Sequence, residues 1–325
     1  MRSLLILALP LIVACADKTA VVDPSDTADV LFEVPSGASG QRVGTLLQDE
    51  GLIASASNWK MVLREVDGSC IKAGKHNVRK SMTVEEIIKE LCGAPVPDDV
   101  AFAVLEGWRI KDIDKALAAK GWIDPGEYTK IATDKAVNLP FEISSPTLEG
   151  YLYPETYRVP PSKDRFSAKR LIERQLGTFQ TRFLVPNQDK LGERTLHDIV
   201  VVASMIEREE PTDKHRPVVA GIIYKRLDSN TALGIDATSR YQLDDWTDEK
   251  AFRKVLKDPN DAYGTRVRAG LPPTAIGNPT QSALEAAINP AETEFWYYLH
   301  DRNGVFHGGR NGAEHERNRA TYGVY

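Results

Sequence analysis

Hydrophobic residues recur at two different spacings in the first hundred residues of the chain. Residues 31–34 alternate apolar and polar side chains, which is typical of a strand with one buried face. Residues 41–50, 58–66 and 83–91 carry apolar side chains three or four positions apart, and the last of these opens with TVEE, which has the form of a capping box. The spacing therefore predicts a small domain of mixed strands and helices at residues 31–96.

The remainder of the chain repeats the order strand, turn and helix before it becomes mainly helical. Residues 101–105 are apolar and precede a turn that contains glycine, after which residues 111–120 have helical spacing. Residues 148–157 are rich in aromatic side chains and interrupted by glycine and proline, which favours a rigid loop. Helical spacing returns at residues 168–183 and 195–208. Together with the first domain, this pattern predicts an α+β protein.

The N-terminus has the composition of a secretory signal rather than of a membrane span. Residues 1–15 contain Arg2 and then a short apolar run, whereas a bilayer span needs about 20 apolar residues. Their last four letters, IVAC, resemble the bacterial lipoprotein cleavage box, which implies that Cys15 is lipidated and anchors the chain to a membrane. A cleaved signal with an incidental cysteine is the alternative. Residues 16–30 are polar and aperiodic, as expected of a linker.

The composition of the chain indicates how many domains it can form and which kinds of partner are not expected. The chain has 325 residues, enough for about two domains, and its 42% hydrophobic residues allow a sizeable core. It carries 41 Lys and Arg against 46 Asp and Glu, a net charge of −5, and has no long basic run. A nucleic-acid partner is therefore not expected. Cys70 and Cys92 could form a disulfide or remain buried thiols, and their spacing matches no metal site.

The helix predicted at residues 195–208 ends in charged residues that could carry chemistry. Thr195 followed by Asp198 suits its N-terminus, and an apolar stripe then leads to Glu207. A carboxyl held against an apolar wall keeps its proton more readily, which suits the acid of a glycoside-cleaving enzyme. The alternative is a solvated helix end at residues 207–210. Because residues two apart on a helix point to different sides, we expect no close carboxylate pair here.

Five motifs occur in a fixed order along the chain. They read LEGYLYPETY at residues 148–157, ASMIERE at 203–209, VAGIIYKRL at 219–227, GLPPTAIGNP at 270–279 and AAINPA at 286–291. Their sequences and order resemble those of the MltG/YceG-like family of endolytic murein transglycosylases. This resemblance implies a small LysM-like accessory domain at residues 31–96, which would help to hold glycan strands, and a mixed α/β catalytic domain at residues 97–325.

The resemblance also implies an activity. Glu207 would be the single catalytic acid/base, giving a proton to the glycosidic oxygen between N-acetylmuramic acid (MurNAc) and N-acetylglucosamine (GlcNAc), then taking one from the muramyl C6 hydroxyl. The product would be a 1,6-anhydro-MurNAc end, formed without water, metal or organic cofactor. Expected partners are nascent glycan strands and the peptidoglycan synthases, so that cleavage would end strand elongation. The enzyme would work in the cell envelope, on the periplasmic face of the inner membrane.

Positions in the matched segments supply the expected substrate contacts. They are Glu209, Asp236, Thr238, Asn278, Tyr151, Glu155 and His315. Local chemistry offers alternatives, since Asp236 and Asn278 could stabilise their own turns and Tyr151 could simply pack in the core. The chain departs from the family where Gly234 replaces a usual Gln and Gly264 a usual Asn. Some hydrogen bonds to the sugars would therefore have to come from other residues.

Two other functions remain open. A muramidase would admit water and need a second carboxylate, about 5 to 5.5 Å away for retention or 6.5 to 9.5 Å for inversion, and Asp236 is the candidate. A non-catalytic glycan-binding lipoprotein would keep the fold but lose turnover through the changes at Gly234 and Gly264. The chemical nature of the new strand ends separates the two enzymes, and an absence of cleavage identifies the binding protein.

Overall fold

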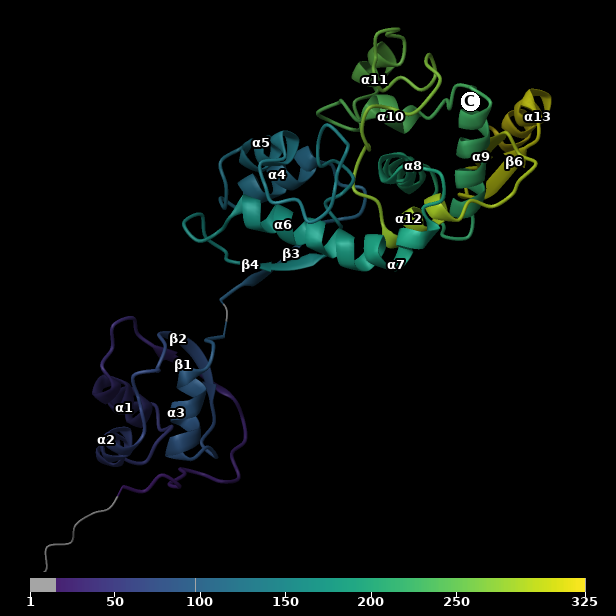
Figure 1. Ribbon diagram of the computed structural model, residues 1–325. Coiled ribbons are helices and arrows are strands. Elements are labelled where there is room, and N and C mark those ends of the chain that lie inside the picture. The colour runs from purple at the N-terminus through teal and green to yellow at the C-terminus, as the bar shows by residue number, and fades with distance from the viewer. Residues whose placement is uncertain (1–15, 97, 325) are drawn as a thin grey trace, which may run out of the picture. The chain divides into compact units, whose positions relative to one another are not determined.

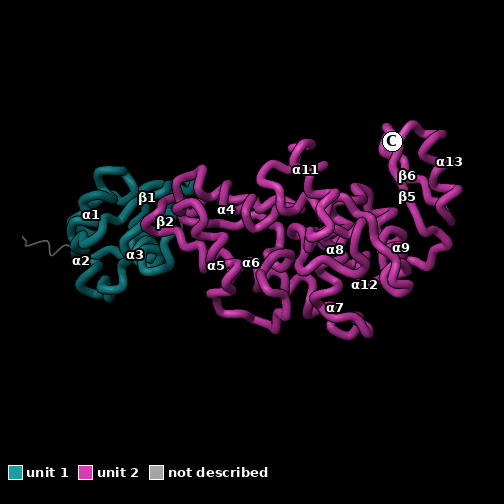
Figure 2. Tube along the Cα trace, turned by 90° about the horizontal axis from the view of Figure 1, so that it is seen from above, with its two compact units in different colours: residues 1–98 teal, residues 99–325 magenta. Residues whose placement is uncertain are grey.

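The computed structural model describes residues 16–96 and 98–324, so the expected lipidation of Cys15 lies outside the described residues. The chain divides into two compact units between Asp98 and Asp99, which Figure 2 draws in separate colours. Each unit has a hydrophobic core of its own. In the described part of the chain, no helix has the length and apolar character that crossing a membrane requires.

Within its described residues, 16–96 and 98, the first unit contains three helices and one two-stranded antiparallel sheet. Its elements are β1 (Val30–Val34), α1 (Gly40–Asp49), α2 (Ala56–Glu65), β2 (Gly74–Val78) and α3 (Val84–Cys92). The strand and the three helices predicted from apolar spacing are confirmed, whereas β2 was missed. The capping box is also confirmed, because the Thr83 hydroxyl accepts the Glu86 N–H at 3.2 Å and the Thr83 N–H donates to the Glu86 carboxylate at 2.8 Å.

Trp59 and one disulfide hold the first unit together. The Trp59 side chain is fully buried, and its Nε1–H donates to the Gly40 carbonyl at 2.8 Å. The ring fits against α1 because Gly44 has no side chain, since a Cβ there would come within 2.2 Å of the ring. Cys70 and Cys92 form a disulfide, which ties the segment before β2 to the end of α3. The structure thus decides between the two states that the sequence left open.

The second unit is mainly helical and contains two short antiparallel sheets (Figure 1). Its strands are β3 (Val100–Ala103) paired with β4 (Thr156–Val159), and β5 (Tyr297–His300) paired with β6 (Phe306–Gly309). Its α-helices, in the described residues, are α4 (Ile110–Ala119), α5 (Glu127–Asp134), α6 (Ala168–Phe179), α7 (Val185–Asn187), α8 (Leu196–Glu209), α9 (Arg216–Asp228), α10 (Asp236–Arg240), α11 (Glu249–Val255), α12 (Gln281–Ile288) and α13 (Gly312–Tyr322). A π-helix, η1 (Gln180–Leu184), joins α6 to α7, and a short 3-10 helix, η2 (Gln188–Lys190), follows α7. Helices combined with small antiparallel sheets confirm the α+β class.

Helix α8 lies inside the second unit, packed against α9, α10 and α12 (Figure 1). Its N-terminus is capped as expected, because the Thr195 hydroxyl accepts the Asp198 N–H at 3.1 Å. Residues 199–206 are all buried, so the helix is enclosed on every side rather than along one stripe. The charged residues that follow Ile206 therefore emerge together from the core at the C-terminal end of the helix.

The aromatic-rich stretch at residues 148–157 is a loop that packs against α8 and then enters β4. The prediction of a rigid loop holds except at its last two residues, which are strand. Gly150 has a φ of +91°, and a Cβ at this position would lie 2.5 Å from Ala275 and 2.6 Å from Val200 of α8. Glycine is required here both by the backbone conformation and by the close approach of the helix.

Candidate active site

A cavity of about 590 Å³ lies beside the C-terminal end of α8. Its wall comes from α8, α9, α10, β5 and α13 and from the segment before α10. The residues singled out from the sequence that line it are Glu209, Gly234, Asp236 and His315. The volume falls within the range of about 300 to 1,000 Å³ that is typical of ligand sites. Positions that are far apart in the sequence thus meet at one candidate site.

Glu209 is the last residue of α8 and lines this cavity. Its Oε2 accepts the Tyr298 hydroxyl at 2.9 Å. Burial raises the pKa of Glu209 against the opposing effect of the Tyr298 bond, and the nearby charge of Asp236 raises it further. The carboxyl therefore keeps its proton to a higher pH than an exposed glutamate does, as a general acid must.

Glu207, two residues earlier, does not line the cavity. Its Oε1 lies 3.3 Å from Nη2 of Arg216, and its Oε2 accepts the Thr280 N–H at 3.0 Å and the Thr280 hydroxyl at 2.6 Å. The Glu207 side chain is only 8% exposed. The prediction that an apolar wall surrounds this carboxylate is wrong. The carboxylate forms a buried ion pair with Arg216 and accepts hydrogen bonds at the N-terminus of α12. The expectation that Glu207 and Glu209 point to different sides is confirmed.

Asp236 and Thr238 lie on the same short helix and have different environments. Asp236 begins α10, lines the cavity and forms an ion pair with Arg266, another residue of the cavity wall. Thr238 is fully buried, and its hydroxyl donates to the Ile235 carbonyl at 2.7 Å. Thr238 therefore stabilises the start of α10 and is not placed to touch a substrate, contrary to the sequence-based expectation.

His315 and Gly234 are two further residues of the cavity wall that the sequence had singled out. The His315 ring stacks on Tyr297 with centroids 5.1 Å apart, and burial lowers the pKa of His315, so the ring is neutral at neutral pH. Gly234 has a φ of +70°, a conformation that favours glycine, which gives a backbone reason for its departure from the family pattern. Among the described residues, no three His, Cys, Asp or Glu side chains are placed to hold a metal ion.

Three expected substrate contacts lie away from the cavity. Asn278 is fully buried; its Oδ1 accepts two N–H groups of the 148–157 loop, and its Nδ2 donates to the Trp108 carbonyl at 2.8 Å. Tyr151 is 1% exposed and packs among aromatic rings of the core. Glu155 immediately precedes β4, is exposed, and its carboxylate lies 3.9 Å from the Arg182 guanidinium. Asn278 and Tyr151 hold loops around α8 in place, and none of the three residues is positioned to contact a sugar in this cavity.

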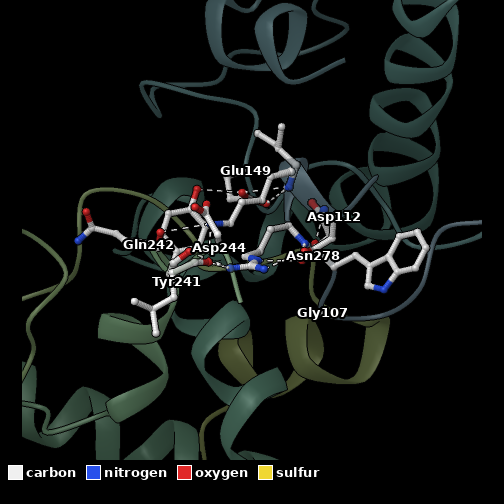
Figure 3. Close-up of polar contacts among 12 residues, drawn as sticks. Gly107, Asp112, Glu149, Tyr241, Gln242, Asp244 and Asn278 are labelled. Carbon is white, nitrogen blue, oxygen red and sulfur yellow. Dashed lines mark hydrogen bonds and ion pairs between the residues drawn. The ribbon is translucent and has the colours of Figure 1, made fainter. Parts of the chain in front are cut away.

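A buried polar cluster, which the sequence did not predict, joins α4 to the segment after α10 (Figure 3). Its centre is Arg109, which is 3% exposed and forms two bonds of 2.8 Å with the Asp112 carboxylate. Nη1 of Arg109 also donates to the Tyr241 carbonyl at 3.0 Å and the Leu243 carbonyl at 2.7 Å. A single guanidinium thus fixes the segment after α10 to the N-terminus of α4.

Glu149 is the buried carboxyl of this cluster, and Figure 3 shows it beside Tyr241. It is 1% exposed, accepts the Ile110 N–H at 3.1 Å and accepts the Tyr241 hydroxyl at 2.9 Å. Burial raises the pKa of Glu149 to about 7. The hollow that it lines has a volume of about 180 Å³. One signal could have revealed it, namely a glutamate within the otherwise apolar and aromatic residues 148–153.

Arg208 connects this cluster to the end of α8. Its Nη2 donates to the Gly107 carbonyl, and its guanidinium lies 4.1 Å from the ring centroid of Trp246. Arg109 lies 5.3 Å from the centroid of the same ring. A Cβ at Gly277 would come within 2.4 Å of the Gly107 oxygen, so the segments cross closely here. At the end of α8, Glu207 thus forms an ion pair, Arg208 contacts an aromatic ring and Glu209 lines the cavity.

Comparison with known proteins identifies the family. A model of the YceG-like family matches residues 32–321. The endolytic murein transglycosylase of Bacillus subtilis strain 168 is 26% identical over 325 residues, covering 93% of this chain and 87% of the relative. That of Streptococcus pneumoniae strain R6 is 24% identical and covers 94% of this chain, which spans 60% of the length of this relative. A solved structure of a yceG-like protein from Listeria monocytogenes matches with a TM-score of 0.59 at 25% identity, covering 90% of this chain and 99% of that one. This chain belongs to the YceG-like family.

Proposed function

We propose that this chain is an endolytic peptidoglycan lytic transglycosylase, which cuts MurNAc–GlcNAc bonds within glycan strands and leaves 1,6-anhydro-MurNAc ends. Two of its relatives are named endolytic murein transglycosylases. The observation that carries the proposal is the carboxyl of Glu209, which lines a cavity of ligand size and has a raised pKa. A lytic transglycosylase needs one such group, because the same carboxyl first donates and then accepts a proton.

Glu209 suits the acid/base role better than Glu207, to which the family resemblance assigned it. The oxygens of Glu207 are already engaged by Arg216 and Thr280, and they do not line the cavity. The side-chain partner of Glu209 is the Tyr298 hydroxyl, and open space adjoins it. We therefore assign the acid/base role to Glu209. We assign to Glu207 the positioning of the end of α8 against α9 and α12.

The proposed reaction moves one proton out and one proton back. Protonated Glu209 gives its proton to the glycosidic oxygen, and the bond between that oxygen and C1 of MurNAc breaks, so that the GlcNAc-ended strand leaves. The C6 hydroxyl oxygen of the same MurNAc then bonds to C1 while its proton passes to the Glu209 carboxylate. Glu209 is thereby returned to its starting state. The cycle consumes no water and calls on no cofactor.

A muramidase is the second candidate, because Asp236 lines the same cavity as Glu209. It would use Asp236 as nucleophile or general base and would leave a reducing MurNAc end. The ion pair between Asp236 and Arg266 argues for the transglycosylase, since it gives that carboxylate a charge partner within the protein. The chemical nature of the new ends separates the two reactions.

We also propose the setting in which the enzyme works. Residues 31–96 would act as a LysM-like accessory domain that holds glycan strands, and residues 97–325 as the catalytic domain. A lipidated Cys15, followed by the linker at residues 16–30, would tether the enzyme at the periplasmic face of the inner membrane. From there it would reach nascent strands and their synthases and end strand elongation. Labelling with a fatty-acid probe, compared between the natural chain and Cys15→Ser, tests the anchor.

The test of the activity incubates the full-length chain with uncrosslinked peptidoglycan strands and identifies the new ends by mass spectrometry. We expect 1,6-anhydro-MurNAc ends from the natural chain. Reducing MurNAc ends would instead establish the muramidase. Strands that are bound but not cut would identify a non-catalytic glycan-binding lipoprotein.

A further inference from the structure

Arg226, in the last turn of α9, places a guanidinium in the wall of the same cavity as Glu209. Nη1 donates to the Leu233 carbonyl at 3.1 Å, and the group lies 4.8 Å from the ring centroid of Tyr297. Its Nε is buried and has no hydrogen-bond partner among the described residues. Burial lowers the pKa of Arg226, which reflects the cost of removing this cation from water. Arg226 is therefore a cation with unused donor capacity.

The other guanidinium groups of the cavity wall are paired with carboxylates. Arg266 forms its ion pair with Asp236, and Arg319 lies 3.0 Å from the Glu316 carboxylate. Within the described ranges, no carboxylate lies within ion-pair distance of Arg226. A half-buried guanidinium is stabilised by a bidentate anionic partner, so a carboxylate of a ligand would supply what the protein does not.

The positions of Arg226 and Glu209 are linked through β5. Tyr297 lies under the Arg226 guanidinium, and its neighbour Tyr298 donates its hydroxyl to Glu209. Both groups line one cavity. A ligand anion bound at Arg226 would therefore be held at a fixed offset from the proton of Glu209. That offset would decide which glycosidic bond receives the proton.

We infer that Arg226 binds a carboxylate carried by the muramyl residue of the glycan strand and so selects the MurNAc–GlcNAc bond for cleavage. This inference rests on the proposed function. MurNAc differs from GlcNAc by its 3-O-lactyl group, which ends in a free carboxylate in peptide-free strands and carries a peptide, with carboxylates of its own, in complete peptidoglycan. The recognised chemistry is the same in both cases. The two sources are separated by the substrates of the test.

The test measures kcat/KM for three strands of equal length. The first is peptide-free with free lactyl carboxylates, the second is peptide-free with those carboxylates converted to neutral amides, and the third carries its stem peptides. We expect Arg226→Gln to lower kcat/KM by roughly tenfold or more on a strand with the recognised carboxylate, mainly through KM. On the neutral amide, the natural chain and the variant should be alike. Loss on the first strand identifies the lactyl carboxylate, and loss on the third alone identifies the peptide.

Two further variants separate recognition from folding. Arg226→Lys keeps the charge and should recover part of the preference for the anionic strand. Arg194→Gln removes an arginine that also lies over a tyrosine ring, Tyr224, but outside this cavity, and should leave the preference unchanged. Equal losses on the anionic and neutral strands in Arg226→Gln would overturn the inference, because a purely structural role predicts that result.

The inference can fail independently of the proposed function. If the natural chain cuts none of the strands, the activity has failed, and the same strands are then compared by equilibrium binding to Glu209→Gln and to Glu209→Gln combined with Arg226→Gln. Weaker binding of the anionic strand in the double variant supports carboxylate recognition. Identical binding of the anionic and neutral strands by both proteins would reject it.

Discussion

Two carboxyls of the second unit, half-buried Glu209 and fully buried Glu149, resemble each other in chemistry and differ in access. Each accepts a tyrosine hydroxyl at 2.9 Å, and burial raises the pKa of each. Glu209 lines a cavity of about 590 Å³, whereas Glu149 lines a hollow of about 180 Å³ and also accepts the Ile110 N–H. A raised pKa therefore does not by itself separate a catalytic carboxyl from a structural one. Space for a ligand beside it is what distinguishes the candidate acid from the structural group.

The largest difference between the two carboxyls should be catalytic. Glu209→Gln should slow strand cleavage by roughly 100-fold to 10,000-fold, since it removes the transferable proton. Glu149→Gln keeps the shape of the buried cluster and should slow cleavage less than about tenfold. Initial rates on uncrosslinked strands measure both. Similar losses in the two variants would mean that Glu149 takes part in the reaction and that the comparison is mistaken.

The second difference between the two carboxyls concerns stability. The polar cluster around Glu149 is held together by a buried cation, Arg109, and should contribute to the stability of the fold. Arg109→Met leaves the Asp112 carboxylate without its bidentate partner and should lower the free energy of unfolding by about 3 to 5 kcal/mol. Chemical denaturation followed by tryptophan fluorescence measures this change. Lys163→Met is the matched control, because it breaks an exposed pair with Asp124 and should leave the unfolding midpoint unchanged. A small effect of Arg109→Met would show that the cluster does not hold α4 in place.

The third difference lies in the pH dependence of stability. The pKa of Glu149 rises from 4.5 to about 7 on folding, so folding favours its protonated form. Its contribution to stability is fully present below pH 4.5 and is lost as the pH rises toward 7, by an amount on the order of 3 kcal/mol. Glu149→Gln cannot ionise and should lack this loss. The difference in unfolding free energy between the two proteins should therefore grow in favour of the variant from pH 4.5 to 7, and a constant difference would contradict the account.

The smallest expected effect comes from Asp236, whose charge contributes to the raised pKa of Glu209. Asp236→Asn removes that charge and leaves Arg266 unpaired, and both changes stabilise the ionised form of Glu209. The alkaline limb of the pH–rate profile should move to lower pH by less than about one unit, with activity retained at its optimum. Abolished activity in this variant would instead support the muramidase, in which Asp236 takes part in the chemistry.

The sequence predicted the elements well, because local spacing reports which residues are apolar. The first strand, the helices of the first unit and α8 all appear where the pattern placed them, and the α+β class is confirmed. The two-residue spacing of Glu207 and Glu209 was enough to predict that they face different sides. Periodicity is a property of neighbours in the chain, so it survives without knowledge of the fold.

The roles of individual site residues could not be predicted in the same way, because they depend on contacts with residues from other parts of the chain. The side chains of Thr280, Arg216 and Tyr298 decide which glutamate of α8 faces open space. The spacing of apolar residues does not report these polar contacts between different elements. Asn278 was a reasonable sugar ligand by residue type. In the structure, the Asn278 side chain instead makes three hydrogen bonds to backbone groups of other loops. A polar residue in a motif does not reveal whether its hydrogen bonds are made inside the protein.

The most direct test of the central claim compares Glu209→Gln with Glu207→Gln in one assay, the rate of formation of 1,6-anhydro-MurNAc ends from uncrosslinked strands. Thermal unfolding of both variants establishes that each is folded. We predict that Glu209→Gln forms essentially no anhydro ends, whereas Glu207→Gln, altered in a positioning contact, retains measurable turnover. Retained turnover in Glu209→Gln together with complete loss in Glu207→Gln would contradict the account and return the acid/base role to Glu207.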